Sequence, residues 1–285
     1  MKSSVGHSII KVNGSTPTTE MDMLTVEEPL EIRMRYGSPF TIKNLAVTMR
    51  TPGHDAELAL GFLFTEGIIA DPSCVKNIDH VTAGCSINDG NIIMVSLQEN
   101  ITPNILNADR NFYTTSSCGV CGKASINAIR VLRLPQVQSW QHPPIAIDIL
   151  NGLPGKVSNR QTVFAETGGL HAATLFNEHG KLLLLREDVG RHNAVDKLVG
   201  KALADKNINL AHCILLLSGR ASFELVQKAA MAGIAVIAAI GAPSSLAVSL
   251  AEEFGITLIG FLRNNRFNIY SAAHRIQIPV YENTH

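Results

Sequence analysis

The chain has 285 residues, 46% of them hydrophobic and 17% charged, so it can bury a sizeable core in one large or two modest domains. Lysine plus arginine and aspartate plus glutamate number 24 each, and this balance gives no overall positive field that would favour nucleic acid. With no N-terminal signal pattern and no apolar run of about 18 residues, we expect a cytoplasmic protein that binds neither nucleic acid nor membrane.

The first half of the sequence predicts a small unit that mixes strands with one helix. Short apolar stretches bounded by glycine, proline and asparagine are typical of strands and turns, while residues 51–55 carry helix start signals. In chain order we expect a loose lead-in at 1–20, strands at 30–34 and 40–49, a buried helix at 56–69, and a hairpin around 88–90 whose second strand is 91–97.

The second half predicts a mixed sheet with a parallel part. Three short apolar runs alternate with two helical segments, which is the β-α-β-α-β pattern of parallel strands joined by crossover helices. We expect strands at 171–176, 181–186, 213–217, 234–240 and 256–261, and helices at 191–203, 223–232 and 246–254. The predicted fold class is α/β, with an N-terminal α+β subdomain at 1–112, a mobile loop and linker at 113–145, and an α/β domain at 146–285.

Two cysteines, Cys118 and Cys121, lie close together between glycines and directly before a helix-like run. A helix N-terminus and the neighbouring Lys123 both favour the thiolate, which is the nucleophilic and metal-binding form of cysteine. The pair could therefore exchange disulfides, hold a metal or carry a sulfur atom as a persulfide. The other cysteines are isolated in the sequence and are interpreted as reduced core residues; they are Cys74, Cys85 and Cys213.

A candidate ligand site follows from the parallel part of the predicted sheet. The loops that leave the carboxyl ends of parallel strands share one edge, and ligands of such sheets bind there. Serine hydroxyls, helix N-termini and arginine guanidinium groups in these loops indicate a site for a phosphate-bearing ligand, most simply a nucleotide. Ordinary turn chemistry is the alternative for each loop taken singly. The loops are 218–222, 241–245 and 262–268, and their candidate ligand residues include Ser218, Arg220, Ser244, Arg263 and Arg266.

Two further polar clusters, at 167–171 and 186–193, flank predicted strands and helix starts. Asp188 could cap the helix that follows it, while His192 could point into a cleft. A lone histidine is more often satisfied structurally than catalytic, so both residues are candidates for a pocket and nothing more specific.

Several segments taken together resemble the FdhD/NarQ family of formate dehydrogenase accessory sulfurtransferases. The resemblance runs from about residue 25 to the C-terminus in the expected order. A Cys-x-x-Cys pair alone is common to many families, so the combination of segments carries the resemblance. The segments are 49–53, 61–67, 118–122, 187–196, 218–224 and 260–270.

The resemblance implies a cytidine-deaminase-like C-terminal core, a homodimer and a sulfurtransferase-type carrier. Such a carrier takes persulfide sulfur from a cysteine desulfurase and delivers it to molybdenum in the bis(molybdopterin guanine dinucleotide) cofactor, a bound client, before insertion into formate dehydrogenase. By resemblance Cys118 carries the persulfide and Cys121 assists, although the helix start close to Cys121 argues for the reverse. The cofactor-binding stretch of the family corresponds here to Phe261, Leu262, Arg263, Asn264, Asn265 and Arg266.

Other classes of protein are weighed against this one. Zinc deaminases need a His-x-Glu ahead of a Pro-Cys-x-x-Cys, and this order is missing, so deamination is rejected. A zinc-binding module would need His171, His192 or a second copy of the chain to complete the cysteine pair. A dithiol redox module would need the cysteines at a strand–helix junction, whereas here they follow a polar loop. The zinc and dithiol alternatives stay open.

Overall fold

The structure is a computed structural model that describes residues 2–81, 90–104, 140–158, 160 and 166–278. It divides into two compact units, and the chain passes between them more than once. Unit 1 comprises Met1–Leu132, Gln161–Ala172 and Arg186–Ala204, and unit 2 comprises Arg133–Arg160, Ala173–Leu185 and Asp205–His285. The units differ from the subdomain, linker and domain predicted from the sequence at 1–112, 113–145 and 146–285. The reason is that the helix at 191–204 packs with the N-terminal part of the chain.

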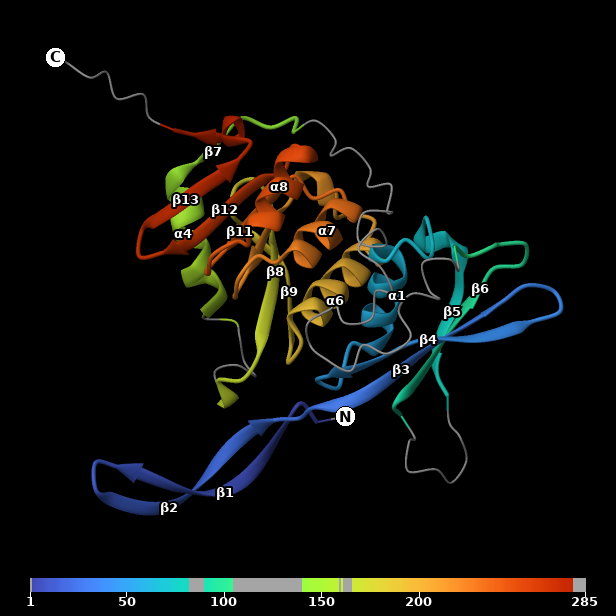
Figure 1. The fold of residues 1–285 in the computed structure, drawn as a ribbon, viewed down its shortest axis with the longest axis horizontal. Coiled ribbons are helices and arrows are strands. Elements are labelled where there is room, and N and C mark those ends of the chain that lie inside the picture. Colours follow the sequence, from blue (N-terminus) through green and yellow to red (C-terminus); the bar gives the residue numbers. More distant parts are fainter. Residues whose placement is uncertain (1, 82–89, 105–139, 159, 161–165, 279–285) are drawn as a thin grey trace. The chain divides into compact units, whose positions relative to one another are not determined.

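In the part of the chain that the structure describes, unit 1 contains a four-stranded sheet and the helices α1 and α6 (Figure 1). Leucine and isoleucine side chains from alternate positions of β3 and from α1 form its apolar core, as expected for a sheet with one buried face. Helices α1 and α6 lie side by side in Figure 1. The sheet order is β4-β3-β6-β5, with bounds β3 (Glu28–Tyr36), β4 (Thr41–Arg50), β5 (Val75–His80) and β6 (Ile92–Leu97); a 3₁₀ turn at Pro72–Cys74 precedes β5, and the helices are α1 (Asp55–Thr65) and α6 (Arg191–Ala204).

The close approach of α1 and α6 depends on two glycines. A Cβ at Gly61 would collide with the carbonyl oxygen of Asp196, and one at Gly200 would collide with the carbonyl oxygen of Glu57. Each glycine thus lets the backbone of the partner helix approach where any side chain would force the helices apart. Beside this contact, the Thr65 hydroxyl donates to the Asp196 carboxylate at 2.7 Å.

Unit 1 also contains a separate two-stranded hairpin, formed by β1 (Ser4–Asn13) and β2 (Thr16–Thr25). The prediction of a loose lead-in at 1–20 is therefore wrong. Gly14 and Ser15 form the two-residue turn between Asn13 and Thr16, and Gly14 has a φ of 61°, which glycine adopts without strain. Polar residues dominate both strands, which hid the alternation that would have predicted them.

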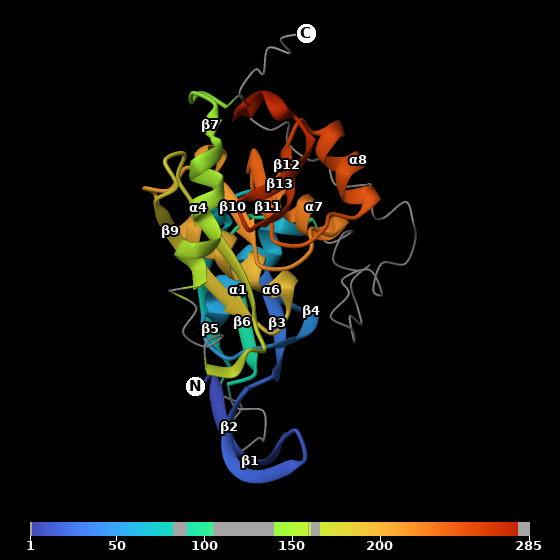
Figure 2. The ribbon, with the colours of Figure 1, turned by 90° about the vertical axis from the view of Figure 1, so that its left-hand side faces the viewer.

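Unit 2 is built around a six-stranded mixed sheet, with α4 on one face and α7 and α8 on the other (Figure 2). The three central strands β10, β11 and β12 run parallel, and antiparallel neighbours complete the sheet on both sides. The order is β13-β12-β11-β10-β8-β9, with β8 (His171–Phe176), β9 (Leu182–Asp188), β10 (Ile214–Leu217), β11 (Val236–Ala239), β12 (Thr257–Arg263) and β13 (Arg266–Ser271). The helices are α4 (Ile147–Ser158), α7 (Phe223–Met231) and α8 (Ser245–Glu253). β7 (Ile145–Ala146) pairs with β14 (Ile276–Gln277), and short 3₁₀ turns at Leu210–His212 and Ala273–Arg275 precede β10 and β14 in the chain.

The predicted α/β class, with a β-α-β-α-β parallel part in a mixed sheet and a smaller α+β part, is confirmed. Two local predictions are corrected. Residues 147–158, for which no helix was predicted, form α4, because Leu150, Leu153 and Val157 recur at helical spacing and bury against the sheet. Residues 262–268, expected as an open loop, are the end of β12, a tight turn and the start of β13.

Candidate functional site

Three loops of unit 2 meet at one edge of the sheet, at the carboxyl ends of β10, β11 and β12. Leu217 is level with Ala239, and Ala238 with Ile259, so the parallel strands end at nearly the same height. The first two loops lead into α7 and α8, whose N-terminal N–H groups therefore open toward this edge. The sheet edge predicted from the sequence is present in the fold.

Backbone hydrogen bonds tie the three loops to one another. The N–H of Gly241 donates to the carbonyl oxygen of Gly219 at 2.9 Å, and the N–H of Phe261 donates to the carbonyl oxygen of Gly241 at 3.1 Å. Further along, the N–H of Ser244 donates to the carbonyl oxygen of Ala221 at 3.0 Å. The loops are therefore held as one layer rather than as three independent turns.

Two glycines make this layer possible by letting adjacent loops touch. A Cβ on Gly241 would lie 2.9 Å from Cγ of Arg220, and a Cβ on Gly260 would lie 2.8 Å from Cδ of Pro243. Both distances are shorter than real Cβ contacts allow, so side chains at these positions would push the loops apart.

Three arginines give this edge a positive charge that no described carboxylate neutralises. Arg220, Arg263 and Arg266 are all exposed, and none of them forms an ion pair with another residue in the described parts of the chain. Guanidinium groups in this state are free to bind an anion, and the fork of N–H donors matches phosphate oxygens.

The serines of the edge have distinct roles. The Oγ of Ser244 accepts from the N–H of Ala247 at 3.2 Å, so this serine caps α8 in the manner of ordinary turn chemistry. Ser222 begins α7 without such a bond, and its buried Oγ has no hydrogen-bond partner in the part of the chain that the structure describes. Ser218 is half-buried at the end of β10.

The stretch Phe261 to Arg266 joins β12 to β13 and divides into buried and exposed parts. Phe261 has a φ of 56° at a bulge, and the side chain of Leu262 is 1% exposed within the apolar core. Asn264 and Asn265 form the turn, with φ values of 54° and 55°. The turn and its flanking arginines therefore offer exposed side chains to a ligand, Phe261 is half-buried, and Leu262 is excluded from side-chain contact with one.

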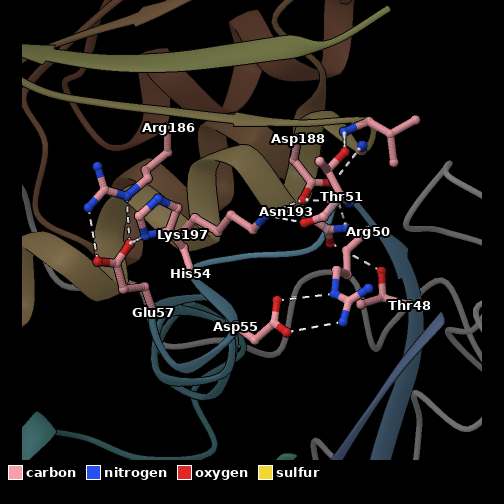
Figure 3. A network of polar contacts seen from close by, with 12 residues as sticks. Thr48, Arg50, Thr51, His54, Asp55, Glu57, Arg186, Asp188, Asn193 and Lys197 are labelled. Atoms are coloured by element: carbon pink, nitrogen blue, oxygen red, sulfur yellow. Dashed lines mark hydrogen bonds and ion pairs between the residues drawn. The ribbon is translucent and has the colours of Figure 1, made fainter. Parts of the chain in front are cut away.

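A buried ion pair in unit 1 organises the second polar cluster of the sequence (Figure 3). The Nζ of Lys197 lies 2.6 Å from Oδ2 of Asp188, and the side chains are 1% and 0% exposed. Lys197 also donates to the carbonyl oxygen of Thr51 at 2.8 Å, and the N–H of Thr51 donates to Asp188 at 3.2 Å. The pair therefore fixes the segment that leads from β4 into α1.

Asp188 does not act as a simple helix cap. Its Oδ1 accepts from the N–H of Gly190 at 2.8 Å and from the side-chain amide of Asn193 at 3.1 Å, while Asn193 also donates to the carbonyl oxygen of Met49 at 2.8 Å. Burial raises the pKa of Asp188, against the opposing influence of Lys197 and these hydrogen bonds. The carboxylate is enclosed, so it is a structural centre of unit 1.

Two further ion pairs flank this centre, and the sequence patterns gave no sign of either. Arg50 is fully buried and contacts Asp55 through two hydrogen bonds of 3.1 Å. Glu57 pairs with Arg186 and with His54, whose Nδ1 lies 3.3 Å from the carboxylate (Figure 3). Burial alone would raise the pKa of Glu57, but the hydrogen bonds and charges of Arg186 and His54 outweigh it and lower that pKa to about 2.

The two histidines of the polar clusters are half-buried. Burial lowers the pKa of His171, and the charges of Arg191 and His192 lower it further, which favours the neutral imidazole. Among the described residues, no group of histidine, cysteine, aspartate and glutamate side chains has the arrangement of a metal site.

The predicted cysteine pair, Cys118 and Cys121, lies outside the described residues, as does Cys85. Cys213 is 2% exposed, and burial, with the charge of Glu178, raises the pKa of its thiol to about 12. Cys74 is half-buried against the apolar core of unit 1. The interpretation of Cys213 as an inert core residue is thus confirmed.

No helix in the described parts of the chain has the length and apolarity needed to cross a membrane. The fold and the sheet edge define a class: a two-unit α/β protein whose larger sheet presents three exposed arginines at the carboxyl ends of its parallel strands. The model of the FdhD/NarQ family matches residues 25–277, and the chain belongs to that family.

Curated relatives match nearly the whole chain. The sulfur carrier protein FdhD of Mycolicibacterium paratuberculosis is 52% identical, covering 90% of this chain and 92% of the relative. The protein of the same name from Streptomyces coelicolor is 49% identical, covering 95% of this chain and 94% of the relative. That of Sulfurisphaera tokodaii is 42% identical, covering 94% and 97% respectively.

One solved structure shows the same fold at low sequence identity. It comes from Desulfotalea psychrophila and was proposed to be a formate dehydrogenase accessory protein. It matches with a TM-score of 0.71 at 23% identity, covering 97% of this chain and all of the other one. At that identity the likeness concerns the fold alone.

Proposed function

We propose that this protein is a sulfur carrier that serves formate dehydrogenase. Membership of the FdhD/NarQ family and relatives named sulfur carrier protein FdhD at 42% to 52% identity support this function. The observation that carries it in the structure is the sheet edge of unit 2, where three hydrogen-bonded loops present arginines without carboxylate partners among the described residues. A carrier needs such a site for the molecule that receives its sulfur.

The sulfur would travel as a persulfide on Cys118. The thiolate of Cys118 attacks the outer sulfur of a persulfide on a cysteine desulfurase; a new S–S bond forms, the donor's S–S bond breaks, and the donor's thiolate leaves. Attack of the Cys121 thiolate on the inner sulfur of Cys118 would then release hydrosulfide and leave a Cys118–Cys121 disulfide, so the cysteine pair supplies the two electrons. A cellular dithiol would reduce this disulfide before the next cycle.

The acceptor in this proposal is molybdenum in the bis(molybdopterin guanine dinucleotide) cofactor, bound as a substrate. Hydrosulfide and a proton replace an oxo ligand and release water, a step that balances without a further oxidant or reductant. The phosphates of the dinucleotide fit the edge chemically, because Arg220, Arg263 and Arg266 supply cations and the N-termini of α7 and α8 supply N–H donors. Ser218, Ser244 and the Asn264–Asn265 turn would line the same site.

The partners of such a carrier are the cysteine desulfurase that donates sulfur and the formate dehydrogenase that receives the finished cofactor. Two copies of the chain would act together as a homodimer in the cytoplasm. The zinc-binding and dithiol redox alternatives make different demands on Cys118 and Cys121, namely bound metal or disulfide turnover without carried sulfur.

Nucleotide binding tests the part of this proposal that rests on the sheet edge. We expect GDP, titrated into the protein by calorimetry, to bind at least about tenfold more tightly than guanosine, because the arginines and helix N-termini act on the phosphates. Binding should weaken as salt is raised, since exposed charges are screened. Equal affinity for GDP and guanosine, or no binding of either, would remove the edge from the proposed function.

A further inference from the structure

The β1–β2 hairpin of unit 1 has two faces of different chemistry. Its register is regular from Ser4, opposite Thr25, to Asn13, opposite Thr16, so alternate residues of each strand share a face. Every charged or titratable side chain of the hairpin falls on one of the two faces: His7, Lys11, Glu20 and Asp22. The opposite face, which we call the uncharged face, consists of Ser4, Gly6, Ser8, Ile10, Val12, Pro17, Thr19, Met21, Met23 and Thr25.

The apolar side chains of the uncharged face are exposed. Ile10 is 71% exposed, Met21 68% and Val12 61%, while Met23 is 37% exposed. The methyl carbon of Met21 lies 3.0 Å from the position that a Cβ on Gly6 would occupy, and the sulfur of Met23 lies 3.8 Å from it, so both methionines fold across this glycine. The result is a continuous apolar strip along both strands.

Among the residues that the structure describes, the side-chain hydrogen bonds from the uncharged face to the rest of the chain are confined to its base. The hydroxyl of Thr25 donates to Oγ1 of Thr167 at 2.8 Å, and the hydroxyl of Ser4 lies 3.3 Å from the Glu166 carboxylate. An isolated two-stranded hairpin is at best marginally stable in water, and both of its outer edges carry unpaired backbone groups. Ten-residue strands with an exposed apolar face therefore fit a surface that is buried against a partner.

The charges of the hairpin argue against a polyanionic partner and are compatible with a second copy of the chain. One lysine and one histidine stand against one glutamate and one aspartate, so the hairpin has no positive excess for nucleic acid or for anionic lipid. On the charged face Lys11 and Glu20 pair at 3.3 Å, and both remain well exposed to water. The uncharged face brings no charge to an interface, so an identical face can pack against it about a two-fold axis without like-charge repulsion or charge desolvation.

We propose that the uncharged face of the β1–β2 hairpin is the surface on which a second copy of this chain docks, face against face. This inference names the surface for the homodimer of the proposed function and is otherwise independent of sulfur transfer. Ile10, Val12, Met21 and Met23 of both copies form the apolar centre of the interface, and the charged faces remain in water.

Sedimentation velocity of the full-length protein over a range of concentrations tests the surface. The double variant Ile10→Lys with Met21→Lys places cations in the strip, and we expect the dimer dissociation constant to rise by at least about 100-fold. The control is Val5→Lys, which changes a 51% exposed residue of the same strand on the charged face. It should alter the constant by less than about threefold. Circular dichroism should show the native fold for both variants, because all three side chains are exposed.

Hydrogen exchange supplies a second measurement that needs no substitution. As the wild-type concentration is raised through the dissociation constant, amides within residues 4–25 should exchange more slowly, because the strands become covered. A dimer that persists in the double variant, or one whose formation leaves these amides unprotected, would refute the surface. A wild-type monomer at all concentrations, or a hairpin that binds only a different protein, would refute the second copy as partner. Persulfide loading in the same samples tests sulfur carriage separately.

Discussion

Arg263 is the last residue of β12, directly before the turn to β13, and its side chain is exposed. We expect Arg263→Ala to weaken GDP binding by about tenfold, because one charge-assisted contact to phosphate is lost. Persulfide loading should not change, since the cysteine pair is a separate part of the chain. Calorimetric titration measures the first effect and mass spectrometry the second.

The matched control for this substitution is Arg160→Ala, which removes an exposed arginine of unit 2 that is not part of the sheet edge. Its GDP affinity should equal that of the wild type. If Arg263→Ala also binds GDP as the wild type does, Arg263 is not part of the site.

The Glu57 carboxylate predicts a pH dependence of stability. Its pKa in the folded protein is about 2, below the ordinary value of 4.5, so the ionised form stabilises the fold above about pH 4.5. That contribution is lost as the pH falls through 4.5 toward 2. Because the group is only about half-buried and solvent screens part of the interaction, we expect Glu57→Gln to cost about 1 to 2 kcal/mol at pH 7.

Urea unfolding at a series of pH values measures this effect. The difference between wild type and Glu57→Gln should shrink below about pH 4.5, whereas the exposed control Glu252→Gln should differ little from wild type at any pH. A difference that stays constant down to pH 2.5 would mean that the Arg186–Glu57 pair does not supply the stabilisation.

At the scale of elements, the contact between α1 and α6 depends on the missing side chains of Gly61 and Gly200. We expect Gly61→Ala to destabilise the protein by about 3 kcal/mol, because the new methyl group collides with the backbone of Asp196, which cannot rotate away. Urea unfolding gives the free-energy change.

A matched glycine provides the control. Gly152 lies in α4 with nothing within 4 Å of the Cβ position, so Gly152→Ala should raise stability by about 0.5 to 1 kcal/mol through its higher helix propensity. If both substitutions had the same effect, the tight helix contact would not be the cause.

Apolar runs predicted most of the core elements. The strands at 214–217, 236–239 and 257–263 follow short buried stretches, and the order of strands and helices fixed where their carboxyl ends meet. The β1–β2 hairpin could not be predicted in this way, because apolar side chains fall on both of its faces, Val5 and Leu24 on one and Ile10 and Met21 on the other, so period-two alternation is weak.

The sheet edge was predicted more fully than the buried ion pairs. Ser218, Arg220 and Ser244 could be assigned to one edge because topology alone brings strand ends together. The partners of Lys197 and Arg50 could not be found in this way, because a buried cation is recognised only by the carboxylate that the tertiary fold places beside it.

At the scale of the whole molecule, the two units have different contents. Unit 1 contains the enclosed ion pairs and the exposed hairpin, and unit 2 contains the sheet edge with its arginines. In the two proposals, the sheet edge of unit 2 binds the dinucleotide, and the hairpin of unit 1 binds the second copy of the chain. In the same proposal the sulfur is carried by Cys118 with the help of Cys121, because their sequence context favours thiolates.

The most direct test of sulfur carriage is mass spectrometry of the intact protein and its peptides after incubation with an active cysteine desulfurase and cysteine. The comparison is between wild type, Cys118→Ala and Cys121→Ala, with Cys213→Ala as the control for a buried thiol. We predict a reducible addition of one sulfur atom in the wild type and the control that is lost in Cys118→Ala. No addition in the wild type, despite an active donor, would contradict sulfur carriage and favour the zinc-binding or dithiol alternative.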